Sequence, residues 1–169
     1  VPLNTGEYKI VVIYDKQEPA LRKNKRFAGI DIGLNNLAAV VTNTEMKPFI
    51  INGRPLKSAN QHYNKNLAKQ KSELPHFINK EGVKKQRSYS KKIRRLTHKR
   101  NCRVDDLLHR ASHQLVQELK QANISIVVIG KNKGWKDAIN IGGKNNQKFV
   151  STPHSKFIDM TVYKLRMEG

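Results

Sequence analysis

The sequence predicts an α/β fold in which a mixed β-sheet carries a long, basic helical insertion. Three short strand-like runs follow one another with tight connections, which indicates an antiparallel meander. A long stretch of helical periodicity follows, and then ISIVVI, the most continuous apolar run of the chain and typical of a buried parallel strand. With 169 residues, the chain is long enough for one core and an appendage.

The charge balance indicates a polyanionic partner. Lys and Arg number 33 against 13 Asp and Glu, a formal net charge of +20. Such an excess raises the energy of a compact state by self-repulsion, a cost that nucleic acid would offset. We see no apolar run of about 20 residues and neither a signal peptide nor a lipid signal. We therefore expect a soluble, cytoplasmic protein that binds neither a membrane nor a small-molecule substrate.

The N-terminal segment is predicted to be a strand followed by a linker. Its β-branched and aromatic run YKIVVIYDK (Tyr8–Lys16) is followed by the breaker Glu18-Pro19. A strand with no partner nearby in the sequence suggests that residues 1–24 are a terminal strand and linker from an upstream domain. Residues 25–169 then form the domain that carries the chemistry.

The meander and the helical insertion follow in order. The strand-like runs are RFAGIDI, LAAVVTN and KPFIIN, between Arg26 and Asn52. A polar, Lys-rich helix is expected from Lys57 to Leu74, where Pro75 ends it. From Val83 to Arg103 basic residues surround a sparse apolar stripe, whereas Val104 to Ala122 has apolar residues at helical spacing. We predict one long helix, solvated in its first half and packed in its second, and a helical insertion over about residues 57–103.

The C-terminal part holds the predicted buried strand, Ile124–Ile129, and one more helix. A loop rich in Gly, Asn and Lys (residues 130–148) separates the strand from a helix over Ser151–Glu168, with Pro153 near its start. His154 is interpreted as a residue of the helix N-terminus rather than a catalytic base. A meander, a helical crossover, a parallel strand and a helix form the element order of the ribonuclease-H-like fold.

Asp31 is the candidate catalytic residue. In that fold, a carboxylate on the first strand binds a divalent metal, and Asp31 stands between Ile30 and Ile32 on a strand otherwise too apolar to carry a charge. Gly29 and Gly33 would leave room for a phosphate to approach. Mg²⁺ is held by one or two carboxylates plus phosphate oxygens. The alternative is an Asp that caps the turn beside Gly33.

Four blocks of the sequence resemble the TnpB/OrfB family of transposon-encoded nucleases. GIDIGLNNLAAVVTN (29–43) resembles the first RuvC-like motif of that family, and IVVIGKNKGWK (126–136) resembles the second. DLLHRASHQLV (106–116) looks like the helix before the second motif, and NNQKFVSTPHSKFIDMTVYK (145–164) like the helix after it. The resemblance covers nearly the whole chain, with the blocks in the family's order.

The resemblance implies a RuvC-like, RNA-guided DNA endonuclease that works in the bacterial cytoplasm at the nucleoid. Base pairing with a guide RNA would supply sequence specificity, while the protein would contact the backbone and cleave with Mg²⁺ held at Asp31. The predicted contacts to DNA and guide RNA lie on the insertion and in the loop after the parallel strand. They are Lys84, Lys85, Arg87, Lys91, Lys92, Arg94, Arg95, Lys99, Arg100, Lys131, Lys133 and Trp135. The alternatives are a merely solvated helix face and, for Trp135, a cap on the edge of a core.

The sequence departs from the family pattern at its second carboxylate. Many members carry Glu where this chain has Gly130, and Asp137 is the next candidate metal ligand, ahead of Asp159. The family's Cys-rich zinc ribbon and final aspartate do not occur, so we expect a RuvC-like domain truncated at its C-terminus. Zinc would be bound only if such a ribbon follows downstream. One carboxylate predicts weak Mg²⁺ binding and no cleavage by this chain alone.

Two further functions stay open at this point. The protein is alternatively a catalytically inactive guided DNA-binding protein or a nucleic-acid-binding transposon remnant, as Gly130 and the missing acids allow. It is alternatively a plain basic RNA-binding or ribosome-associated module in which GIDIG occurs by coincidence.

Overall fold

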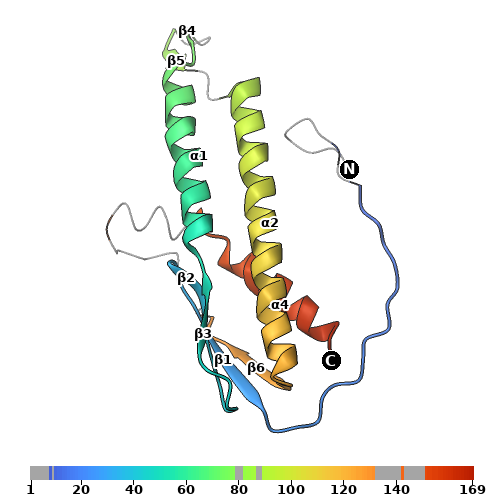
Figure 1. The fold of residues 1–169 in the computed structure, drawn as a ribbon. Coiled ribbons are helices and arrows are strands. Elements are labelled where there is room, and N and C mark those ends of the chain that lie inside the picture. Colours follow the sequence, from blue (N-terminus) through green and yellow to red (C-terminus); the bar gives the residue numbers. More distant parts are fainter. Residues whose placement is uncertain (1–7, 9, 79–81, 87–88, 132–141, 143–150) are drawn as a thin grey trace.

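A computed structural model describes residues 8, 10–78, 82–86, 89–131, 142 and 151–169. The described part consists of one sheet, three helices and a small hairpin (Figure 1). In chain order the elements are β1 (Phe27–Ile32), β2 (Asn36–Thr42), β3 (Phe49–Asn52), α1 (Arg54–Ser72), β4 (His76–Ile78), β5 (Lys84–Gln86), α2 (Lys91–Gln121), β6 (Ile126–Ile129) and α4 (His154–Arg166). None of the described helices is both long enough and apolar enough to cross a membrane.

The four-stranded sheet has the order β3-β2-β1-β6. β1 pairs antiparallel with β2, and β2 pairs antiparallel with β3, as the meander predicted. β6 pairs parallel with β1, with Phe27 opposite Ile126 and Ile30 opposite Ile129. The three strands of the meander, the parallel strand after the helical crossover and their directions are confirmed, and the chain has the predicted mixed α/β architecture.

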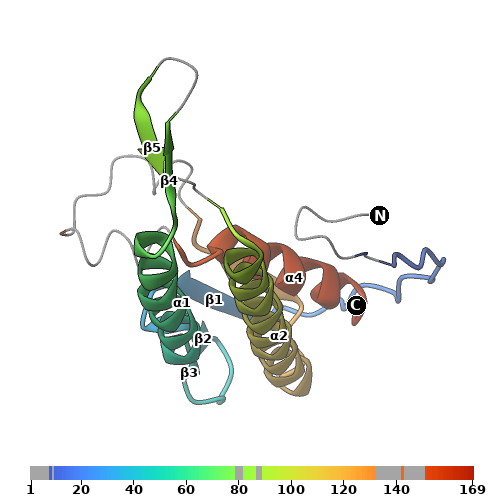
Figure 2. The same ribbon diagram turned by 90° about the horizontal axis from the view of Figure 1, so that it is seen from above.

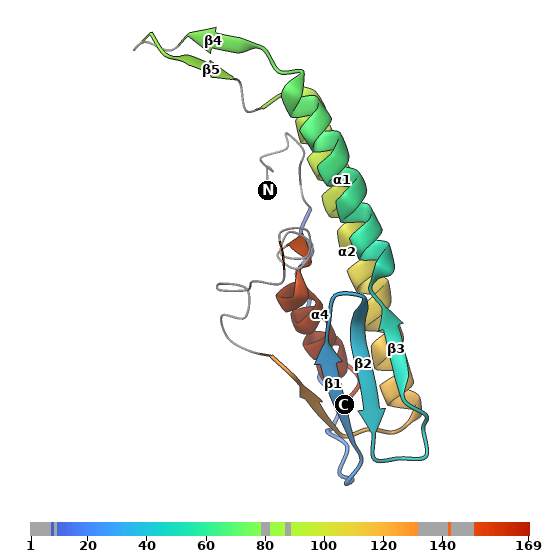
Figure 3. The ribbon, with the colours of Figure 1, turned by 90° about the vertical axis from the view of Figure 1, so that its left-hand side faces the viewer.

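The two faces of the sheet have different environments. The face bearing Ala28, Ile30 and Ile32 is buried in one core cluster with residues of α2 and α4, and both helices lie on that side of the sheet (Figure 3). On the other face, Ile126 and Val128 are 52% and 60% exposed. The prediction of a fully buried parallel strand was wrong. β6 is the edge strand, and within the described residues its outward side chains lack a covering layer.

α1 and α2 extend from the sheet as an antiparallel pair with the β4–β5 hairpin at the far end (Figures 1 and 2). We call α1, β4, β5 and residues 91–103 of α2 the arm. The sheet, residues 104–121 of α2 and α4 are called the base. α1 begins before the predicted position, since Pro55 fits the first turn of a helix, where a missing N–H costs nothing.

The long helix α2 begins later than the sequence predicted. Ser90 is its N-cap and accepts a hydrogen bond from the Ile93 backbone N–H at 3.2 Å. Upstream, Lys84–Gln86 pairs with His76–Ile78 as a two-stranded ladder. The helix expected over residues 84–86 was wrong because pairing across the hairpin overrides the local helical pattern there.

The N-terminal segment is not a strand. Residues 10–20 have no ladder partner among the described residues. The side chains of Ile10 and Ile13 are 89% and 90% exposed. β-branched residues favour a strand only where a neighbouring strand accepts their backbone hydrogen bonds. The chain joins the base at Arg22, whose guanidinium donates to the Ile124 carbonyl at 3.2 Å and the Glu168 carbonyl at 3.1 Å. The division at residue 24 stays a prediction.

Candidate active site and nucleic-acid interface

Asp31 lies where the ends of two parallel strands meet. It stands next to the last residue of β1, on the open face of the sheet, and its side chain is exposed. The Gly130 backbone N–H, just past β6, donates to the Ile30 carbonyl at 2.9 Å. A Cβ built on Gly130 would be 4.0 Å from Oδ1 of Asp31. The two positions that the sequence analysis associated with metal binding are therefore immediate neighbours.

The turn after Asp31 is closely packed. A Cβ on Gly33 would lie 2.8 Å from the Asn36 carbonyl oxygen, which is too close, so glycine is needed there. By contrast, a Cβ on Gly29 would meet nothing within 4 Å. Gly29 therefore lies on a part of the sheet face that no described residue covers, whereas Gly33 serves the turn itself.

His154 connects this turn to helix α4. It is 1% exposed, and its Nε2 lies 3.1 Å from the Gly33 carbonyl oxygen. Because a carbonyl only accepts, Nε2 carries the proton in this contact. The sequence interpretation placed His154 correctly at the helix start but missed this buried link. The signal was available, since His154, Phe157, Ile158 and Thr161 share one helical face and all are buried.

The carboxylates available for a metal are few. In the part of the chain that the structure describes, no group of three or more His, Cys, Asp or Glu residues converges. Asp31 offers one hard oxygen donor group, which suits Mg²⁺ when phosphate oxygens complete the shell. Asp159 lies on the exposed side of α4. Asp137 lies outside the described residues, as do Lys133, Trp135 and Arg87, so their predicted roles stay predictions.

The cations of α2 separate into two groups. Five predicted nucleic-acid contacts are exposed on the arm: Lys91, Lys92, Arg94, Arg95 and Lys99. Among the described residues, no acidic side chain pairs with the Lys and Arg residues from 91 to 103, whereas Asp106 pairs with Arg110 at 2.8 Å in the base. Unneutralised charges gathered on one element are the electrostatic footprint of a polyanion site.

Arg100 differs from the other predicted contacts. Its guanidinium donates to Asn60 Oδ1 at 2.9 Å and to the Ser151 carbonyl at 3.2 Å. It also lies 5.5 Å from the ring centroid of Tyr63. This side chain ties α2 to α1 and to the segment before α4, so its hydrogen bonds are already used inside the protein.

The remaining predicted contacts lie at the two ends of the molecule. Lys84 and Lys85 are on β5 at the tip of the arm, opposite Ile78 and Phe77 in the ladder. Lys131 is exposed and follows Gly130, so it is two residues past the end of β6 on the Asp31 side of the sheet. The predicted interface thus runs from the hairpin along α2 and has a separate basic residue near Asp31.

The mixed sheet, with a carboxylate at the joined ends of two parallel strands and a basic arm, has the element order and strand directions of the ribonuclease-H-like fold. The chain belongs to the OrfB_IS605 family, described as a probable transposase, whose profile matches residues 9–136. The fold also resembles the protein in a cryo-EM structure of a Cas12f1-sgRNA-target DNA complex, with a TM-score of 0.56 and 15% identity. That match covers 89% of this chain and 36% of the Cas12f1 chain. A search of curated proteins gave no match.

Proposed function

We propose that this chain is the catalytic-sheet segment of an RNA-guided DNA endonuclease of the TnpB/OrfB type. The observation that carries the proposal is the position of Asp31, exposed at the joined ends of β1 and β6. Membership in a transposase family and a fold shared with Cas12f1 support it. The family match also favours this function over a plain basic RNA-binding module.

In this proposal Asp31 holds a divalent metal, and the arm holds nucleic acid. Bound Mg²⁺ would neutralise charge on a phosphodiester and lower the pKa of an attacking water. The chain's own contribution is to fix the carboxylate on a rigid strand beside an open sheet face. The exposed cations of α2 would bind phosphates of DNA and guide RNA, contributing affinity rather than sequence recognition.

A second candidate function rests on Gly130. The position beside the Asp31 carboxylate has no side chain, and among the described residues Asp31 is not part of any group of three or more His, Cys, Asp or Glu residues. One carboxylate alone predicts weak metal binding, so the second candidate is a guided DNA-binding protein that does not cleave.

One experiment separates the two. The protein, with any sequence that its gene adds at either end, is purified with its transposon-end RNA and given matching DNA and Mg²⁺. We expect Asp31→Asn to reduce cleavage by roughly a thousandfold or more, the scale of losing an essential group, and to change the affinity for DNA less than twofold. Asp159→Asn, which also removes an exposed carboxylate, is the matched control and should leave cleavage unchanged.

The outcomes are distinct. Equal cleavage by wild type and Asp31→Asn would remove Asp31 from the mechanism. Guided binding without cleavage in the wild type would establish the second candidate function. Failure to bind any nucleic acid would overturn both.

A further inference from the structure

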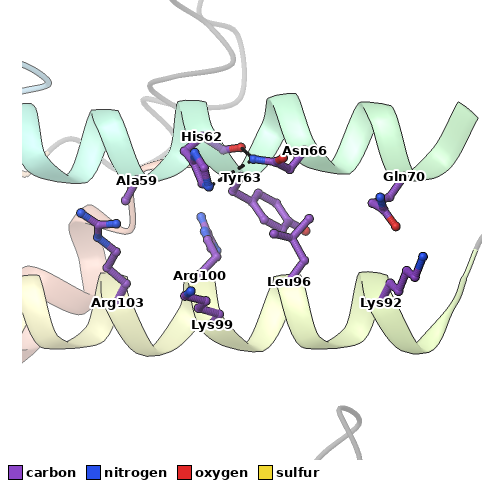
Figure 4. A pocket seen from close by; sticks show the side chains of 10 residues that line it. All are labelled: Ala59, His62, Tyr63, Asn66, Gln70, Lys92, Leu96, Lys99, Arg100 and Arg103. Carbon is purple, nitrogen blue, oxygen red and sulfur yellow. Dashed lines mark hydrogen bonds between the residues drawn. The ribbon is translucent and has the colours of Figure 1, made fainter.

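A cavity of about 400 Å³ lies between α1 and α2 within the arm, away from Asp31 (Figure 4). Its size falls within the roughly 300–1,000 Å³ typical of small-molecule sites. Its lining residues come from both helices and include the predicted phosphate contacts Lys92 and Lys99, but the aromatic, apolar and amide side chains of the lining have no role in phosphate binding or in the metal-site hypothesis. The chemistry of the lining identifies what would fit there.

The inner wall of the cavity is aromatic and apolar. Tyr63 points from α1 toward α2, and Leu96 lies opposite it (Figure 4). The Tyr63 hydroxyl is 3.1 Å from Thr97 Oγ1, and the Arg100 guanidinium lies over the ring at 5.5 Å. Tyr63 is therefore held in one orientation from two sides. A fixed aromatic ring beside a guanidinium plane is a surface on which a nucleobase stacks.

The mouth of the cavity is cationic. Lys92, Lys99 and Arg103 line it from α2, and all three side chains are exposed. His62 lines it from α1 and is exposed too. Because the cationic groups of Lys92, Lys99 and Arg103 lie at the solvent side while the ring lies inside, a ligand with an aromatic body and an anionic end matches the site.

Amide side chains give the cavity groups that can read an aromatic edge. Asn66 and Gln70 line it from α1 (Figure 4). Each amide has a carbonyl acceptor and two N–H donors, and the edge of every base presents both donors and acceptors. An acidic peptide without aromatic residues would satisfy the cations and the amides but would leave the ring without a stacking partner.

We propose that this cavity holds one unpaired nucleotide of a single-stranded nucleic acid. The base stacks on Tyr63, and the phosphates on its two sides lie toward Lys92 at one end of the cavity and toward Lys99 and Arg103 at the other. This inference rests on the proposed function, in which the arm binds nucleic acid, and adds that the arm also discriminates an unpaired nucleotide from a duplex. A paired base cannot enter, since it is stacked and hydrogen-bonded within its helix.

The test is binding of labelled oligonucleotides to the chain and three variants. The probes are a single-stranded RNA, a single-stranded DNA of the same sequence, a duplex, and a single strand of abasic sites. Tyr63→Leu removes the ring but keeps apolar volume. Lys92→Ala removes a cation at the mouth, and Lys91→Ala removes the neighbouring exposed cation, which does not line the cavity.

We expect Tyr63→Leu to weaken binding of a base-bearing single strand about tenfold, the scale of one lost stack, and to leave duplex and abasic binding unchanged. Lys92→Ala should weaken binding of the single strand more than Lys91→Ala. A larger effect on RNA identifies the guide as the source of the nucleotide, and a larger effect on DNA identifies the target strand. Equal effects of the two Lys variants, or equal losses on duplex and single strand with Tyr63→Leu, would overturn the proposal.

A second measurement uses the unaltered protein. A single strand containing 5-iodouridine, irradiated when bound, is expected to cross-link to the tryptic peptide of residues 58–65, which contains His62 and Tyr63. Cross-links confined to other peptides would overturn the cavity assignment while leaving nucleic-acid binding by the arm intact. An absence of binding by every probe would instead overturn the proposed function.

Discussion

The arm and the base use one continuous helix, α2, in opposite ways. From Lys91 to Arg103 the helix has seven cations and no acidic residue, and Ile93 is its one buried side chain. From Val104 to Gln121 it buries six side chains, and acidic residues occur beside its cations. The change takes place within one turn, although the helical backbone continues without interruption.

The base contains the contacts that stabilise the fold, whereas the arm carries the charges that favour binding of a polyanion. In the base, Asp105 pairs with Lys156 and Lys120 with Glu168, each at 2.6 Å, so α2 is joined to α4. In the arm the exposed charges repel one another, which disfavours the compact state until a polyanion neutralises them. We therefore expect changes in the base to alter folding and changes in the arm to alter binding.

The largest expected effect is on stability and tests the base. Leu108→Ala removes a side chain that is 0% exposed, and should lower the free energy of unfolding by about 2–5 kcal/mol. Leu96→Ala, in the half-buried stripe of the arm, should cost only about 1 kcal/mol. Denaturant unfolding followed by circular dichroism measures both. Equal losses would show that the arm and the base are not distinct.

The second effect is on binding and tests the arm. Arg94→Ala together with Arg95→Ala removes two exposed cations, and should reduce the slope of log affinity against log salt concentration by about one to two. Arg110→Ala is the matched control, since Arg110 is paired with Asp106 in the base, and should leave the slope unchanged. If the slope stays constant in the arm variant, this face of α2 does not contact phosphate.

The third effect sharpens the interpretation of Gly130. Gly130→Glu should place a second carboxylate near Asp31, since a Cβ there meets its nearest atoms at 3.6 Å and 4.0 Å, ordinary contact distances. The added charge should tighten Mn²⁺ or Mg²⁺ binding about tenfold, measured by calorimetry. Gly130→Gln has the same size without the charge and should bind metal as the wild type does. Equal metal affinity of the Glu and Gln variants would show that a carboxylate at position 130 does not bind the metal held by Asp31.

The smallest effect concerns the partly exposed ion pair between Lys120 of α2 and Glu168, which follows α4. The pKa of the Glu168 carboxyl lies below its usual value, and the main cause is the hydrogen bond that it accepts from Lys120. A lowered carboxylate pKa stabilises the fold above the unfolded-state value, and this contribution is lost as the pH falls through the folded pKa. Lys120→Ala should cost less than about 1 kcal/mol at pH 7.

Thermal unfolding of wild type and Lys120→Ala at several pH values measures this effect. The difference should disappear in acid, where Glu168 is protonated in both proteins. Lys120→Arg, which keeps the charge, should behave as the wild type. A difference that persists at low pH would mean that Lys120 stabilises the base by packing rather than by its charge.

Local patterns were sufficient wherever one element's own periodicity decided the outcome. The strand-like runs and their tight connections predicted an antiparallel meander, and β1, β2 and β3 pair in that way. The spacing of apolar residues predicted that the first half of α2 is solvated and the second half is packed, and the buried residues of α2 are distributed in this way. Asp31 could be singled out because a charge on so apolar a strand requires a reason.

Patterns failed where the outcome depends on which second segment a residue pairs with. Residues 10–16 are strand-forming but have no ladder among the described residues, and Lys84–Gln86 joins a hairpin instead of a helix. The cavity at Tyr63 was missed entirely, because α1 and α2 are independent patterns in the sequence and only their packing brings Tyr63, Arg100 and Lys92 together.

The sequence by itself determined the strand directions, the basic surface and the identity of the one chemically distinctive carboxylate, since alternation, charge and turn chemistry are local properties of the chain. Only the tertiary structure decided that Gly130 is the neighbour of Asp31, that His154 holds the turn after it, and that the arm encloses a cavity. Each of these depends on two segments separated by dozens of residues, and their contact is fixed by the packing of the whole core rather than by either segment alone.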